Sequence, residues 1–223
     1  MDAAKPSVFV TGGTGYLGRP LISSLLSQGC SVRALVREGS QHKLPPGCTP
    51  VIGDALDGKS YGAQIQPAET FVQLVGVSHP SPAKAAEFRK VDFVSACGAI
   101  DAAAHAGVRH FIYLSVAHPA PVMKAYVAVR SECEARLVAS GMNATILRPW
   151  YVLGPGHWWP YAVKPFYWLF SLLPPTRAGS QRLGLVTLAQ MTAALADAVA
   201  HPSTGVRVVE VPEIRRYRGL KAA

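Results

Sequence analysis

Acidic residues are scarce in this chain, and the usual signatures of disulfide and metal chemistry are missing. Asp and Glu together number 13 against 22 Lys and Arg, which gives the 223 residues a formal net charge of +9. None of the cysteines forms a CxxC pair, and none of the histidines forms an HExxH motif, so we expect neither a disulfide framework nor a metal site. The opening residues MDAAKPS contain no apolar signal region, which predicts a cytoplasmic protein with reduced cysteines.

Long uninterrupted apolar runs are also missing. Pro160, Lys164 and Pro165 interrupt the only apolar stretch that is long enough to consider as a transmembrane helix. The basic residues near the C-terminus are accompanied by no nucleic-acid-binding motif, and they are typical of a solvated tail: Arg215, Arg216, Arg218 and Lys221. The excess positive charge suits an anionic cofactor or attraction to an anionic membrane, and we expect no nucleic-acid partner.

Glycine, by contrast, is concentrated in the stretch VFVTGGTGYLGRPLISSLLSQG, residues 8–29. Residues 7–11 are rich in β-branched and aromatic side chains and predict a buried strand. Leucines then recur at helical spacing, and Gly29 supplies a helix stop. The glycines lie in the turn between strand and helix, where unpaired N–H groups can hold a pyrophosphate. A tight turn alone would use the same residues, but the second strand expected at 31–36 favours nucleotide binding.

Strand-like and helical segments alternate along the rest of the chain. Further strands are expected at residues 49–52, 70–75, 110–115, 144–147, 182–187 and 206–211, and helices at residues 83–106, 122–139 and 188–200. This alternation predicts a doubly wound, parallel α/β sheet of the Rossmann type, in a single domain that covers residues 1–223. Ligands bind such sheets outside the carboxyl ends of the strands, so site residues should follow the strands directly.

Aromatic residues are concentrated in residues 149–181, which we expect to form a small C-terminal lid. All four tryptophans lie between Trp150 and Trp168, among repeated prolines. The segment suits a lid over a flat or prenylated apolar ligand, or contact with a bilayer interface. A small lid core packed on the sheet is the third interpretation.

Five further motifs follow the glycine turn in order. They are GDALD at residues 53–57, VGVSHP at 75–80, FIYLS at 111–115, YVAVR at 126–130 and LRPWYVLGPG at 147–156. With the GxxGxxG spacing of the turn, the chain resembles an extended or atypical short-chain dehydrogenase/reductase over nearly its whole length. It is most similar to the short atypical branch with NmrA-like proteins, the nucleotide-binding accessory subunit of respiratory complex I and a related coenzyme Q biosynthesis protein.

The resemblance implies a nicotinamide dinucleotide site, with these residues carried over by position. The pyrophosphate would be held by the backbone at Gly12, Gly15, Tyr16 and Leu17, and Gly18 completes the motif. The adenine would be met by Asp54, and the nucleotide ribose would be lined by Val75 and Gly76. The nicotinamide face would be met by Pro149 and Trp150.

The end of the second strand bears on which cofactor is bound. An NAD-specific site usually offers a carboxylate there, but the sequence SVRALVRE places Val36 at that position and Arg37 after it. A guanidinium can hold the 2′-phosphate of NADP through a forked, charge-assisted contact. The alternatives are that Arg37 is an exposed loop residue beside Glu38 and that the cofactor is NAD. We expect NADP.

The catalytic motif of the resembled family is altered here. That family uses a Tyr, a Lys four residues later and a Ser near the end of the fifth strand. Tyr126 is present, Arg130 replaces the lysine, and Ser115 is the candidate serine, although Val116 competes for its position. Arginine keeps the charge but cannot relay a proton. Tyr126 and Arg130 could also be an exposed helical pair.

Two functions follow from these residues. The first is an NAD(P)-dependent oxidoreductase that acts on an apolar carbonyl or quinone-like compound, with peripheral membrane contact. The second is a nucleotide-binding module that senses, or that stabilises an assembly, without turnover. The Tyr126, Arg130 and Ser115 constellation separates them, and the sequence does not name the substrate.

Overall fold

A sheet of seven parallel strands forms the centre of the computed structural model, which describes residues 6–155 and 183–217. The strand order is β3-β2-β1-β4-β5-β6-β9, and every neighbouring pair is parallel. The strands are β1 (Ser7–Thr11), β2 (Ser31–Val36), β3 (Thr49–Ile52), β4 (Thr70–Gln73), β5 (His110–Leu114), β6 (Asn143–Arg148) and β9 (Val206–Glu210). The predicted doubly wound α/β fold class is confirmed.

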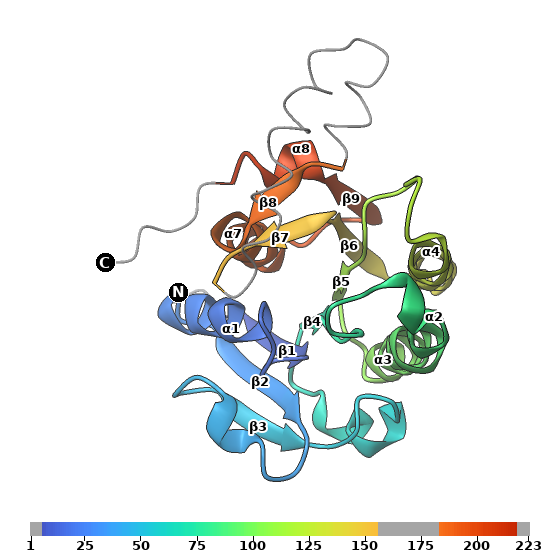
Figure 1. Ribbon diagram of the computed structural model, residues 1–223. Coiled ribbons are helices and arrows are strands. Elements are labelled where there is room, and N and C mark those ends of the chain that lie inside the picture. Colours follow the sequence, from blue (N-terminus) through green and yellow to red (C-terminus); the bar gives the residue numbers. More distant parts are fainter. Residues whose placement is uncertain (1–5, 156–182, 218–223) are drawn as a thin grey trace.

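Helices cover both faces of this sheet (Figure 1). One face carries α1 (Gly18–Ser27) and α7 (Leu188–Ala200), and the other carries α3 (Val94–His105) and α4 (Lys124–Ala139). A one-turn helix α2 (Ala85–Glu87) precedes α3, and α8 (Val211–Ile214) follows β9. Two short strands, β7 (Tyr151–Leu153) and β8 (Leu185–Thr187), pair in parallel outside the main sheet.

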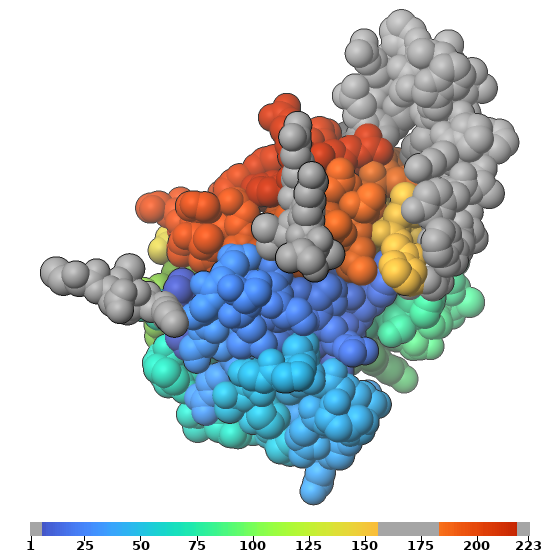
Figure 2. Space-filling model, turned by 90° about the vertical axis from the view of Figure 1, so that its left-hand side faces the viewer, coloured from blue at the N-terminus to red at the C-terminus, as the bar shows by residue number. Residues whose placement is uncertain are grey.

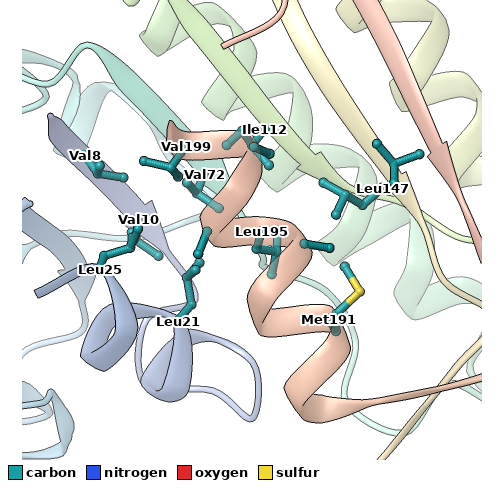
Figure 3. Packing of buried hydrophobic residues seen from close by; sticks show 14 of the residues in the cluster. Val8, Val10, Leu21, Leu25, Val72, Ile112, Leu147, Met191, Leu195 and Val199 are labelled. Carbon is teal, nitrogen blue, oxygen red and sulfur yellow. The ribbon is translucent and has the colours of Figure 1, made fainter. Parts of the chain in front are cut away.

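The alternation of side chains along the strands explains why helices are needed on both faces. In β1, Val8 and Val10 pack in one buried cluster with α1 and α7, whereas Phe9 belongs to the cluster on the other face. Figure 3 shows the first cluster, with Leu21 of α1 and Leu195 of α7 over the valines. Figure 2 shows the same two helices as adjoining blue and orange surfaces. Each such fully buried side chain contributes about 1.5–3 kcal/mol.

Aromatic rings fix the register of the central strands on the opposite face. Phe9, Phe71 and Phe111 are aligned partners in β1, β4 and β5, and their ring centroids lie 5.2 and 5.1 Å apart. Tyr61 extends this row, with its centroid 5.8 Å from that of Phe9. A slip of one residue would turn each ring to the other face, so this stack specifies the alignment at the centre of the sheet.

Several expected boundaries differ from those observed. The expected strands 70–75, 110–115 and 206–211 end at Gln73, Leu114 and Glu210, because the chain leaves the sheet there or, at Val211, begins α8. The helix expected over residues 83–106 is not uniform, since Phe88–Phe93 are π-helical. The strand β7 was not predicted. The aromatic segment lies outside the described residues from 156 to 181, so its lid role stays a prediction. Among the described residues, no helix is long and apolar enough to span a membrane.

Candidate functional site

A cavity of about 530 Å³ opens at the carboxyl edge of the sheet, where the connections from β1 and β4 leave in opposite directions. Its wall includes nine residues that the sequence predicts for the cofactor: Gly12, Gly15, Tyr16, Leu17, Gly18, Arg37, Asp54, Val75 and Gly76. Pro149, Tyr126, Arg130 and Ser115 are not part of this wall. The fold thus brings the predicted nucleotide residues together around one space.

The glycines of the first turn are needed for different physical reasons. Gly12 has a φ of +73°, which favours glycine. A Cβ on Gly18 would lie 2.2 Å from the carbonyl oxygen of Gly12, so Gly18 lets α1 start directly against the turn. At Gly15, an added Cβ would meet only the Gly12 oxygen, at 3.1 Å. The protein crowds this position with a single backbone oxygen, and on the cavity side the missing side chain of Gly15 favours the approach of a ligand.

The N-terminus of α1 is free to attract an anion. Its N-cap residue, Leu17, makes no side-chain capping hydrogen bond, and the first turn of the helix holds no acidic residue. The positive end of the helix dipole therefore faces the glycine turn without a competing carboxylate. Within the first turn of the helix, the Arg19 N–H donates to the Gly15 carbonyl at 3.2 Å and Pro20 has no N–H, so the remaining donors are those of the glycine turn and Gly18. This arrangement is suited to a phosphate or pyrophosphate.

Three cationic or hydroxyl-bearing side chains line the cavity beyond β2. Arg37 is joined there by Ser40 and Lys43, which the sequence analysis missed. The Ser40 N–H donates to the Arg37 carbonyl at 3.0 Å, and the Lys43 N–H donates to the Ser40 carbonyl at 3.1 Å. These consecutive turns bring all three residues to one end of the cavity. Their spacing within seven residues was the available signal.

Asp54 supplies a carboxylate to the same wall. Its Oδ1 accepts a hydrogen bond from the Leu56 N–H at 2.9 Å, and its own N–H donates to Ser60 Oγ at 2.9 Å. Both bonds hold the turn after β3, so Asp54 is fixed in place at the cavity before any ligand arrives.

Arg130 does not extend into solvent from α4. Its guanidinium is buried, with Nη2 2.6 Å from Asp92 Oδ1 and Nη1 2.7 Å from the Leu114 carbonyl oxygen. A third contact, from Nη1 to the Tyr113 hydroxyl, measures 3.3 Å. The guanidinium also lies against the α-carbon of Gly76, behind the cavity wall. The alternative interpretation, in which Tyr126 and Arg130 form an exposed helical pair, is therefore wrong.

Tyr126 lies one helical turn before Arg130 and is partly buried. Its ring packs on Phe88 with a centroid distance of 4.9 Å and lies 5.2 Å from the Arg130 guanidinium carbon. Burial raises the pKa of Tyr126 above its ordinary value, and the nearby guanidinium offsets only part of this rise. Burial therefore holds the Tyr126 hydroxyl in its protonated form and makes it a weaker acid than an exposed tyrosine.

Ser115 lies in a separate buried network at the ends of β5 and β6. Its hydroxyl donates to Glu134, which also accepts from Arg148 and lies 3.3 Å from His118 Nε2. Arg148 in turn reaches Glu210 of β9 at 3.0 Å. The hydroxyl hydrogen of Ser115 is thus engaged by Glu134 in this arrangement.

Pro149 is buried beside this network, and its carbonyl accepts the Ala117 N–H at 2.9 Å. The proline therefore joins the segments that follow β5 and β6.

The glycine turn is also in contact with the segment after β6. A Cβ on Gly154 would lie 2.1 Å from the Tyr16 hydroxyl oxygen and 3.1 Å from Leu188 Cβ. Gly154 therefore makes room for the end of the Tyr16 side chain, which is directed toward β7 and α7. This contact links the GPG sequence to the first glycine motif.

A match to a known protein family covers the part of the chain that lines the nucleotide cavity. The model of the family described as NAD(P)H-binding matches residues 12–155, from the first glycine of the turn to the segment that follows β7. The chain belongs to this NAD(P)H-binding family. It is thereby a member of the short-chain dehydrogenase/reductase superfamily, in its atypical part, as the sequence motifs predicted.

Curated relatives of this NAD(P)H-binding chain carry names of two kinds. It is 27% identical over 217 residues to a ceramide reductase of Caulobacter vibrioides, which covers 96% of this chain and 66% of the relative. It is 26% identical to a 4-hydroxy-2-methyl-3-oxo-4-farnesyl-3,4-dihydroquinoline-1-oxide ketoreductase of Stigmatella aurantiaca, over 66% of this chain and 50% of that protein. It is 29% identical to the photosystem II assembly factor Ycf39 of Cyanophora paradoxa, over 64% and 44%. The chain thus spans about two thirds or less of each relative.

Among solved structures, the Bordetella bronchiseptica enzyme WbmH in complex with NAD+ matches with a TM-score of 0.68. The match is 22% identical and covers 91% of this chain and 75% of the other. At this identity the likeness concerns the fold alone.

The residues of this NAD(P)H-binding chain fit a nicotinamide dinucleotide. Gly15 presents no side chain to the cavity, the start of α1 has no side-chain cap, and the cationic residues Arg37 and Lys43 line the cavity. Gly12, Gly15 and the start of α1 would hold the pyrophosphate, and Asp54, Val75 and Gly76 would line the nucleoside.

Proposed function

We propose that the chain is an NADP-dependent reductase of a ketone or quinone-like group carried by an apolar molecule. The observation that carries the proposal is the dinucleotide cavity together with Tyr126, whose ring lies 5.2 Å from the Arg130 guanidinium that backs Gly76 of the cavity wall. Reduction of a carbonyl needs a proton donor near the oxygen that gains charge, whereas oxidation of an alcohol needs a base. A protonated tyrosine hydroxyl can serve as that donor.

The choice of NADP rests on the end of the cavity beyond β2. Arg37, Ser40 and Lys43 supply a planar guanidinium, a hydroxyl and an ammonium at the cavity end where the ribose 2′ position is expected. Charge-assisted hydrogen bonds to a phosphate are the strong ones, and a free 2′-hydroxyl could not use all three groups. NAD would still bind through the glycine turn, with lower affinity.

The dinucleotide, when bound, supplies the hydride. The chain's own residues bind and orient it through the glycine turn, and Tyr126 donates the proton to the substrate oxygen. Arg130 stabilises the tyrosinate that this leaves, since its guanidinium carbon is 5.2 Å from the ring. Arg130 cannot lose a proton, so the proton that restores Tyr126 must come from solvent or from the substrate side.

The names of the relatives and the composition of the chain both support an apolar substrate. Two relatives are named as reductases, one of a ceramide and one of a farnesyl-bearing oxo compound. The aromatic residues that follow Pro149 suit a similar apolar chain. We therefore propose a ketone or quinone attached to a long alkyl or prenyl chain.

A second function is favoured by the engagement of the expected catalytic groups. The Ser115 hydroxyl donates to Glu134, and Arg130 is held by Asp92. A relative is named as an assembly factor. In this alternative the chain binds the nucleotide and stabilises a partner without turnover.

NADPH consumption separates the two functions. We expect oxidation of NADPH with a long-chain ketone or a prenylated benzoquinone, and little with a small polar ketone. Tyr126→Phe should lower kcat by roughly a hundred- to ten-thousandfold and leave the Kd for NADP unchanged. Tyr217→Phe is the matched control, because the Tyr217 hydroxyl donates to Asp197 at 2.8 Å and is not part of the cavity. Tight NADP binding with no turnover of any probe would contradict the reductase and support the alternative.

A further inference from the structure

A buried ion pair lies directly behind the wall of the nucleotide cavity. The side chains of Asp92 and Arg130 are 0% and 5% exposed, and their closest oxygen and nitrogen atoms are 2.6 Å apart. Neither residue was predicted to pair with the other, since 38 positions separate them. Charged groups are costly to bury, so a pair in this place needs a local reason.

The loop after β4 provides that reason. Val75, Gly76 and Ser78 line the cavity. The Asp92 carboxylate accepts the Val77 N–H through Oδ2 at 3.0 Å, while its Oδ1 holds Arg130. One carboxylate therefore fixes the backbone of the cavity wall with one oxygen and the guanidinium with the other.

Gly76 shows how closely the arginine supports this loop. A Cβ on Gly76 would lie 2.2 Å from Arg130 Nη2 and 3.0 Å from Asp92 Oδ1. The φ of Gly76 is outside the left-handed region, so its backbone conformation does not require glycine. Its missing side chain instead lets the guanidinium lie against the main chain, and the cavity wall rests on the ion pair.

The segment that carries Asp92 forms another part of the wall. Val91 lines the cavity, and the two residues belong to the π-helical stretch Phe88–Phe93. A π-helical turn changes the direction of side chains relative to a regular α-helix and is frequent at functional sites. Here it places Val91 at the cavity and the carboxylate of its neighbour under the β4 loop.

The other end of the guanidinium is anchored to the sheet. Nη1 donates to the Leu114 carbonyl at 2.7 Å, at the last residue of β5. Arg130 thus joins α4, the end of β5, the π-helical stretch and the loop after β4. A planar guanidinium can donate in two directions at once, whereas a lysine ammonium at this depth could not reach both partners with the same geometry.

We infer that the Asp92–Arg130 pair is a positioning element for the cofactor, and that nucleotide affinity depends on this pair although it stands behind the cavity wall. The inference rests on the proposed function in one respect, that a dinucleotide occupies the cavity. Removing one partner leaves the other charge buried and unpaired, and the wall must move to relieve it. Removing both charges together relieves that cost.

The test measures the Kd of NADP+ and NAD+ by calorimetry, and the urea midpoint, for four full-length variants. Asp92→Asn and Arg130→Met each remove one charge, their double variant removes both, and Arg130→Lys keeps the charge without the fork. Arg136→Met is the matched control on α4, since it breaks the exposed pair with Asp101 at 2.8 Å. Should Arg130→Met not fold, Arg130→Lys and Asp92→Asn carry the test.

We expect each single variant at the pair to raise the Kd of both nucleotides by roughly three- to thirtyfold. The double variant should regain part of that affinity, and Arg136→Met should bind like wild type. Unchanged Kd values beside a lowered urea midpoint would overturn the inference, because the pair would then serve stability alone. Absence of nucleotide binding by the wild-type chain would be a different result, the failure of the proposed function.

Discussion

His110 is a buried titratable group that should make the stability of the fold depend on pH. It is the first residue of β5 and is 1% exposed, with Nε2 3.0 Å from Thr145 Oγ1 and 3.4 Å from Ser203 Oγ. Its Nδ1 is buried and has no hydrogen-bond partner among the described residues. Burial lowers the pKa of His110 from 6.5 to about 4, because the charged imidazolium would lose its hydration.

The direction and size of the effect follow from this lowered pKa. Above pH 6.5 the imidazole is neutral in both the folded and the unfolded chain, and the group costs nothing. Between pH 6.5 and about 4 the unfolded chain binds a proton that the folded chain excludes, so the free energy of unfolding falls as the pH falls. The slope approaches about 1.4 kcal/mol per pH unit, which amounts to about 2 kcal/mol between pH 7 and pH 5.

Urea unfolding at pH 7 and pH 5 measures this contribution. His110→Gln removes the titrating group and keeps a polar side chain, so the variant should lose about 2 kcal/mol less than wild type over the same interval. The control His42→Gln removes an exposed imidazole and should retain the wild-type difference. Equal pH dependence in wild type and His110→Gln would refute the reasoning.

Three further predictions concern the cavity and the aromatic segment. Gly15→Ala should fold but bind NAD and NADP more weakly, as calorimetry would show, and full affinity in the folded variant would exclude the glycine turn as the phosphate site. Gly18→Ala should instead lower the urea midpoint of unfolding, because its methyl group would lie 2.2 Å from a backbone oxygen. Arg37→Ala and Lys43→Ala should each weaken the binding of NADP by about 1–3 kcal/mol and leave the binding of NAD unchanged. Equal losses of affinity for both nucleotides would show that neither residue contacts the 2′-phosphate. Residues 150–170 should let the chain bind anionic vesicles in a manner that salt weakens without abolishing; no co-sedimentation with anionic or neutral vesicles would argue for a plain lid core.

The fold was largely predictable because its strands are buried on both faces. Parallel strands under two helical layers are continuous apolar runs, as in VFVT and HFIYL, and the glycine turn marks the first crossover. The ends of these strands were harder to predict, since leaving the sheet changes no periodicity. The same holds for Phe88–Phe93, where a π-helical turn keeps a helical composition.

The candidate site was predictable where it depends on local spacing. Residues next to strand ends, such as Gly15 and Arg37, do line the cavity. Arg130 shows the limit of this reasoning, because its position four residues after Tyr126 says nothing about Asp92 on another segment. The cost of a buried charge, which decides where Arg130 points, depends on partners that only the folded chain brings together.

The contact between Tyr16 and Gly154 has a mutational consequence. Tyr16 follows Gly15 in the turn that would receive the pyrophosphate, and its hydroxyl occupies the space that the missing side chain of Gly154 leaves beside α7. A side chain at position 154 would displace the end of Tyr16, which lines the nucleotide cavity, although Gly154 itself is not part of the cavity wall. A substitution after β7 would therefore act on nucleotide affinity through the first glycine motif.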